Sequence, residues 1–128
     1  MEIVSFEIAK KLKEKGYPQI KRNAFAMYDN EGEMYSLCSA LGEEYWYDDF
    51  DETDYVAPTI SQVLKWLFDE KQLFINVDCN ICDHFGLYFK VYKKSKETWD
   101  ECTTGDDYFK HPTEAIFAGI EYIIDNLI

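Results

Sequence analysis

Basic residues are scarce in this sequence of 128 residues, where 13 Lys and Arg stand against 25 Asp and Glu, a formal net charge of −12. None of the 13 lies between Asn23 and Leu64, a stretch that holds ten acids. Proteins bind nucleic acids and anionic membranes mainly through Lys and Arg. We therefore predict no direct nucleic-acid binding and no membrane binding, and the acidic block favours a basic protein partner.

Sequence motifs of common enzymes are missing as well. The chain has no Walker A loop, no Gly-x-Gly-x-x-Gly, no Gly-x-Ser-x-Gly and no His-Glu-x-x-His. His84 and His111 are the only histidines, and His111 precedes Pro112 where a helix is predicted to start. Carboxylate pairs carry no weight, because 25 acids bring some together by chance. We predict that the protein is not an enzyme and uses no cofactor.

Targeting segments are not visible either. No apolar run approaches the roughly 18 residues of a membrane span. The first residues lack the basic region and apolar stretch of a signal peptide, since Glu2 comes at once. Four cysteines without an export signal are typical of reduced thiols, so we predict a cytoplasmic protein.

Helix boundaries are the clearest local feature that the sequence does contain. Ser5 is a predicted N-cap, and Gly16 falls where the same helix should end. Thr59 and Gln62 have the spacing of a capping box at the start of a second helix. Pro112 occupies the first position of a predicted terminal helix.

Strands are predicted by alternation of apolar and polar residues. A hairpin turning at residues 29–32 follows the first helix, and strands are expected near 75–79, near 85–91 and at "ETWDEC". The 47% hydrophobic content suffices for a core. We predict one α+β domain over residues 1–128, with an antiparallel sheet of about 3–5 strands packed against three helices. Residues 42–56 should form an acidic loop.

That acidic loop is the first candidate binding site. Acids and aromatics alternate irregularly in it, and loops of this kind are often functional. Aromatic rings supply contact area and carboxylates supply charge, so we expect this surface to engage a basic protein or to mimic nucleic acid. The candidate residues are Tyr45, Trp46, Tyr47, Asp48, Asp49, Phe50 and Asp51.

The "CNICDH" stretch is the second candidate. A redox Cys-x-x-Cys needs a thiol at a helix N-terminus, but alternation predicts a strand after Cys82. A structural zinc ion needs four ligands, and Cys79, Cys82 and His84 with Cys102 from a neighbouring strand supply that number. The alternative, which we prefer, is a plain turn that joins two strands.

The predicted terminal helix, 112–127, is apolar almost all round and has one narrow polar stripe. A helix of this kind is buried on several sides. It is therefore either the central element against the sheet or a contact with a second copy, which leaves a homo-oligomer open.

Three segments, "SFEIAKKLKEKGYPQ" (Ser5–Gln19), "APTISQVLKWL" (Ala57–Leu67) and "HPTEAIFAGIEYII" (His111–Ile124), carry a resemblance. In this order they resemble a family of small proteins encoded by phages, prophages and mobile elements of gut bacteria. The chain departs from the pattern at His111 and Thr113, and neither "CNICDH" nor the acidic loop belongs to it. The resemblance implies an intracellular α+β domain and assigns no site residues. We expect a non-enzymatic accessory protein, with a zinc-stabilised binding module as the alternative.

Overall fold

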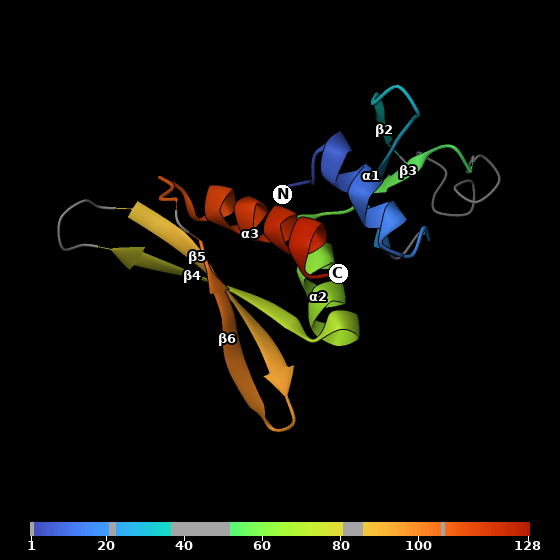
Figure 1. Ribbon diagram of the computed structural model, residues 1–128. Coiled ribbons are helices and arrows are strands. Elements are labelled where there is room, and N and C mark those ends of the chain that lie inside the picture. The colour runs from blue at the N-terminus through green and yellow to red at the C-terminus, as the bar shows by residue number, and fades with distance from the viewer. Residues whose placement is uncertain (1, 21–22, 37–51, 81–85, 106) are drawn as a thin grey trace. The chain divides into compact units, whose positions relative to one another are not determined.

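The structure, a computed structural model, describes residues 2–20, 23–36, 52–80, 86–105 and 107–128 (Figure 1). Three helices and two antiparallel sheets of three strands form in these ranges, which confirms the α+β prediction. The chain divides into two compact units, Met1–Val63 and Leu64–Ile128.

The first unit contains one helix and a sheet with the strand order β2-β1-β3. The Ser5 side chain accepts a hydrogen bond from the Ile8 N–H at 3.3 Å, so the predicted N-cap is confirmed. The predicted hairpin turn is also present, and the Asp29 carboxylate accepts the backbone N–H of Glu31 and Glu33, each at 2.9 Å. The elements of this unit are α1 (Phe6–Glu14), β1 (Ala26–Tyr28), β2 (Met34–Ser36) and β3 (Tyr55–Ala57).

Strand β3 corrects the predicted extent of the acidic loop. Tyr55 and Val56 were expected in the loop over 42–56, but they pair with Tyr28 and Met27 of β1. A strand of three residues is too short to show an alternating pattern. Its pairing therefore depends on a distant partner that local sequence does not identify.

Helix α2 (Ile60–Lys71) begins at the predicted capping box. The Gln62 N–H donates to the Thr59 hydroxyl at 3.2 Å, and the Thr59 N–H donates to the Gln62 side-chain oxygen at 2.8 Å. Two of the N–H groups that every helix leaves unpaired at its start are thereby satisfied.

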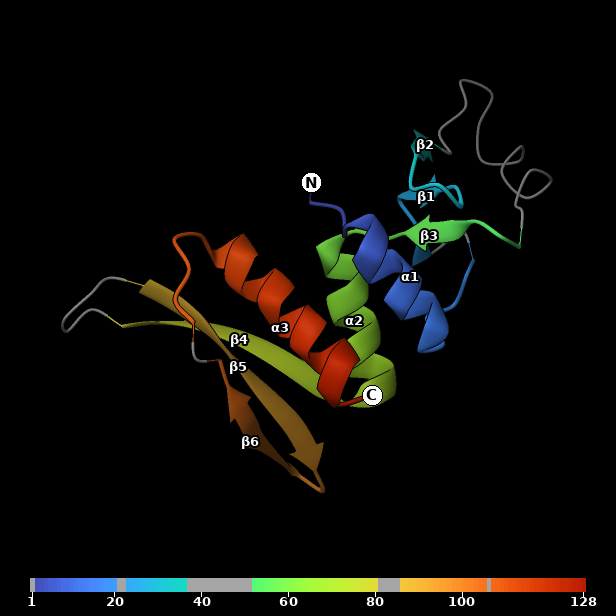
Figure 2. The same ribbon diagram turned by 45° about the horizontal axis from the view of Figure 1, so that its top comes forward.

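The second unit contains a sheet with the order β4-β5-β6 and one terminal helix (Figures 1 and 2). His111 is the N-cap residue of this helix and Pro112 takes its first position, as predicted. Within the described residues, no helix is both long enough and apolar enough to cross a bilayer. The elements are β4 (Leu73–Asn80), β5 (Gly86–Ser95), β6 (Thr98–Thr104) and α3 (Pro112–Asn126).

Helix α3 packs on one face of β4 and β5. A Cβ atom at Gly119 would lie 3.1 Å from Ile75 and 3.3 Å from Phe89, so helix and sheet are in close contact there. Side chains alternate between the two faces of a strand. Ile75 and Phe89 point toward α3, and therefore Phe74 and Tyr92 point to the opposite face, which is called here the outer face.

Candidate functional site

The acidic and aromatic residues Tyr45–Asp51 lie outside the residues that the structure describes, so their predicted role stays a prediction. The chain directly after them is well anchored. The Lys13 ammonium donates to the backbone carbonyls of Glu52 and Asp54 and lies 4.9 Å from the centre of the Tyr55 ring. The Tyr35 hydroxyl donates to the Asp54 carboxylate, which is buried.

Two of the four proposed zinc ligands, Cys82 and His84, also lie outside the described residues. Cys79 and Cys102 are described, and both are exposed free thiols. Cys102 is exposed as a residue, but its sulfur is partly buried beside the Val91 carbonyl, and this partial burial is the main cause that raises the pKa of the thiol. Among the described residues, no group of three or more His, Cys, Asp or Glu side chains is arranged to hold a metal ion.

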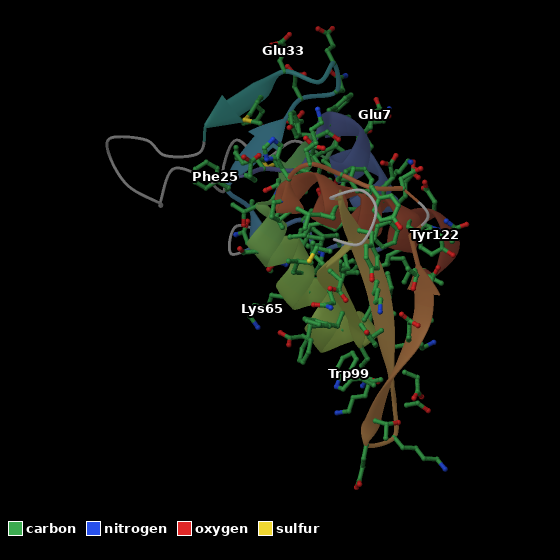
Figure 3. The ribbon with its side chains drawn as sticks, turned by 90° about the vertical axis from the view of Figure 1, so that its left-hand side faces the viewer. Glu7, Phe25, Glu33, Lys65, Trp99 and Tyr122 are labelled. Atoms are coloured by element: carbon green, nitrogen blue, oxygen red, sulfur yellow. The ribbon has the colours of Figure 1, made fainter. Side chains whose placement is uncertain are left out.

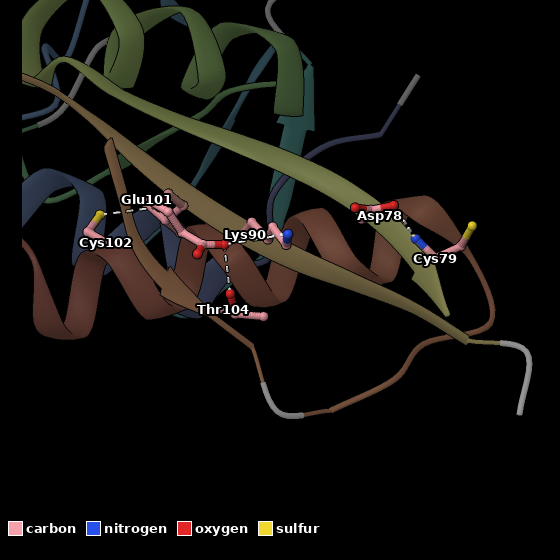
Figure 4. A network of polar contacts seen from close by, with 7 residues as sticks. Asp78, Cys79, Lys90, Glu101, Cys102 and Thr104 are labelled. Carbon is pink, nitrogen blue, oxygen red and sulfur yellow. Dashed lines mark hydrogen bonds and ion pairs between the residues drawn. The ribbon is translucent and has the colours of Figure 1, made fainter. Parts of the chain in front are cut away.

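Cys79 and Cys102 are not brought together. Cys79 pairs with Leu87 across one side of β5, whereas on the other side the Cys102 thiol donates to the Val91 carbonyl at 3.3 Å (Figure 4). Leu87 and Val91 are four residues apart, roughly 13 Å along a strand. Thiolates on one zinc ion lie within about 4 Å of each other, because each Zn–S bond is about 2.3 Å. A zinc ion held by Cys79 would therefore need a ligand other than Cys102.

The outer face of the β4–β5–β6 sheet carries an exposed cluster of aromatic side chains. Phe68 of α2 stacks on Trp99 of β6, with ring centres 5.2 Å apart and an interplanar angle of 22°. Phe74 of β4 lies edge-on to Trp99, with centres 6.3 Å apart, and is 6.5 Å from the Tyr92 ring of β5. Figure 3 labels Trp99 near the hairpin tip.

These rings surround a groove of about 430 Å³, called here the aromatic groove, which is lined by Phe68, Phe74, Asn76, Tyr92 and Trp99. Phe68 is 47% exposed, Phe74 46% and Trp99 36%. Among the described residues that line the groove, no side chain is charged. Aromatic side chains are frequent at protein interfaces, where Trp and Tyr offer a polar group as well as apolar area.

A polar row lies beside the groove on the same face. The Lys90 ammonium is 3.6 Å from the Glu101 carboxylate, which also accepts a hydrogen bond from the Thr104 hydroxyl at 3.0 Å (Figure 4). Tyr88 and then Glu101 raise the pKa of Lys90. Lys90 therefore keeps its positive charge at neutral pH.

A second cavity of about 450 Å³ lies between α3 and the end of the sheet. It is more polar than the aromatic groove, and its lining includes Thr103, Asp107, Glu121 and Asp125. Acids alone do not define a ligand site, because exposed carboxylates are stable in water without one.

Sequence reasoning did not find the aromatic groove. Phe68 and Trp99 lie on a helix and a distant strand, and their stacking results from tertiary packing. The sequence does contain one indication of it, because Phe74 and Tyr92 stand next to the buried residues Ile75 and Val91 and so point to the opposite face of the sheet. Large aromatics at the outward positions of two neighbouring strands predict a cluster once the pairing is known.

Comparison with known proteins finds no matching family model, no matching curated protein and no matching solved structure.

Proposed function

We propose that this protein is a non-enzymatic accessory protein that binds a segment of another protein in the aromatic groove. The exposure of Phe68, Phe74 and Trp99 is the observation that carries the proposal. These rings contact one another yet remain between 36% and 47% exposed. A partner that covered them would remove further apolar area from water, at about 25 cal/mol per Å².

The partner segment should carry an apolar or aromatic side chain next to basic residues. The uncharged groove suits the apolar side chain, and the net charge of −12 attracts a basic chain over long range. The predicted acidic surface Tyr45–Asp51 would add to this attraction. A role as the product of a phage or mobile element, as the resemblance implies, agrees with a small accessory binding protein.

A selection from displayed random twelve-residue peptides tests this proposal. The peptides are selected on the immobilised protein and then measured singly against Trp99→Ala and against Phe25→Ala. Phe25 is a matched control because it is 42% exposed and lies outside the groove. Circular dichroism first establishes that both variants remain folded.

The proposal predicts enriched peptides that combine an apolar side chain with lysine or arginine. Their affinity should fall at least tenfold for Trp99→Ala, because interface aromatics commonly contribute 2 kcal/mol or more, and should stay within about twofold for Phe25→Ala. Enriched peptides that bind both variants equally well, or no enrichment at all, would contradict the proposal.

A further inference from the structure

Strand β6 is an edge strand. It pairs with β5 on one side, and no other described strand pairs with its second side. Six of its seven residues are exposed, and Thr103 is half-buried. An edge strand presents unpaired N–H and C=O groups, to which an extended chain can add.

The strand with the open edge and the aromatic groove share one residue, Trp99, whose ring contacts Phe68 and Phe74. Residues Thr98–Glu101 pair regularly with β5, and the register then shifts opposite Val91 and Tyr92. Trp99 lies opposite Lys94, and Glu101 lies opposite Tyr92. Trp99 and Glu101 are two residues apart and share the outer face. An added strand would thus meet an aromatic ring and a carboxylate at adjacent positions on that face.

The charges along this edge favour a basic strand. β6 contains Asp100 and Glu101 but no lysine or arginine. Strand β5 contains Lys90, Lys93 and Lys94. An added strand would lie about 5 Å from β6 and about 10 Å from β5, so the acids of β6 would be closer to it than these lysines. A second copy of β6 would instead place acids near acids, which is unfavourable.

We propose that the bound segment is extended and adds to the sheet as a fourth strand beside Thr98–Glu101. This inference rests on the proposed function, since it specifies how the partner segment occupies the same groove. One apolar side chain of the segment covers Trp99 at the rim of the groove. A lysine or arginine two residues along the segment lies against Glu101 and shares its carboxylate with Lys90.

Synthetic peptides test this pairing. The probe is an acetylated and amidated seven-residue peptide in which phenylalanine and lysine alternate at the odd-numbered positions and threonine fills the even-numbered positions, measured by isothermal titration calorimetry. A phenylalanine and a lysine then lie two residues apart on the same face of the strand. Two derivatives carry N-methyl groups, one on every odd-numbered amide and the other on every even-numbered amide. In a strand, the N–H groups of alternate residues point to the same edge, so each derivative blocks one edge and keeps all side chains.

The inference predicts that one N-methylated derivative loses at least tenfold in affinity while the other binds like the parent peptide. Two derivatives that both bind like the parent, or that both lose affinity equally, would overturn it. A parent peptide that fails to bind, or that binds Trp99→Ala as well as the unchanged protein, would instead contradict the proposed function itself. The two failures are therefore distinguishable.

The carboxylate contact has a matched control of its own. Glu101→Gln should weaken binding of the parent peptide about twofold to fivefold, as expected for a partly exposed charge pair. Glu31→Gln removes the same charge from an exposed turn outside the sheet and should change the affinity by less. Equal losses for the two variants would show that only overall charge matters and would overturn the assigned contact.

Discussion

Replacement of Gly119 by alanine should destabilise the protein, although alanine is the better helix former. In the middle of a helix, alanine is favoured over glycine by about 1 kcal/mol. Here, however, the added Cβ would lie 3.1 Å and 3.2 Å from two Ile75 methyl carbons and 3.3 Å from Phe89 Cγ. Comfortable carbon–carbon contacts lie near 3.5–4.0 Å, so both neighbours would have to move.

The Phe89 ring has little space in which to move. A Cβ at Gly105 would lie 2.5 Å from Phe89 Cε1, so the backbone at Gly105 closes the other side of the ring. The Tyr122 ring lies 5.9 Å away, centre to centre. Overpacking of a core costs about 1–3 kcal/mol, which exceeds the helix-propensity gain. We expect a net loss near 1 kcal/mol, or a melting temperature lower by about 3–5 °C.

Thermal unfolding of Gly119→Ala measures this loss, with Phe89→Leu and the double variant completing a cycle. The smaller leucine should relieve the crowding, so the alanine should cost less in the double variant than in the single one. Gly119→Ala that melts higher than the unchanged protein would refute the close contact of α3 with Ile75 and Phe89. The assignment of the outer face would then lose its basis, because it depends on that contact.

Two further predictions concern the first unit and its boundary. Thr59→Ala should lose about 1 kcal/mol of unfolding free energy in urea titrations, because it removes the acceptor of the Gln62 N–H, while Thr59→Ser should lose much less; equal losses would contradict the capping role. Burial raises the pKa of the Tyr17 phenol, whose hydroxyl donates to the Asn23 carbonyl at 2.7 Å. The stabilisation from the buried, protonated phenol is fully present below about pH 10 and is lost as pH rises above the pKa of an unfolded tyrosine. Between pH 10 and 12 the unfolding free energy of Tyr17→Phe should therefore fall less steeply than that of the unchanged protein. Parallel curves for the two proteins would count against this linkage.

The helix starts were predictable because they depend on neighbours in sequence. The first turn of a helix has unpaired N–H groups, and hydrogen bonds to them come from Ser5 in α1 and from Thr59 and Gln62 in α2. Pro112 at the start of α3 has no N–H group to pair. The strands of the second unit were predictable from alternation, since α3 covers one face only. Strand β3 was missed because three residues show no period.

The aromatic groove was not predictable, because the distance between Phe68 and Trp99 is set by how α2 and the β5–β6 hairpin pack. The four-ligand zinc site stays a prediction, because Cys82 and His84 lie outside the described residues. The separation of Cys79 from Cys102 has a related cause. Residues on strands of one sheet can be separated along the strand direction by many ångströms. Spacing in the sequence gives the number of candidate ligands, whereas strand register determines which of them meet.

The most direct test of the binding proposal is a two-dimensional amide NMR titration of the full chain with a peptide obtained from the display selection. We predict the largest shift changes at Phe74, Tyr92 and Trp99, including the Trp99 indole N–H, and along β6, with small changes in α1 and α3. Changes concentrated in α1 or α3, with β6 and the groove unaffected, would contradict it.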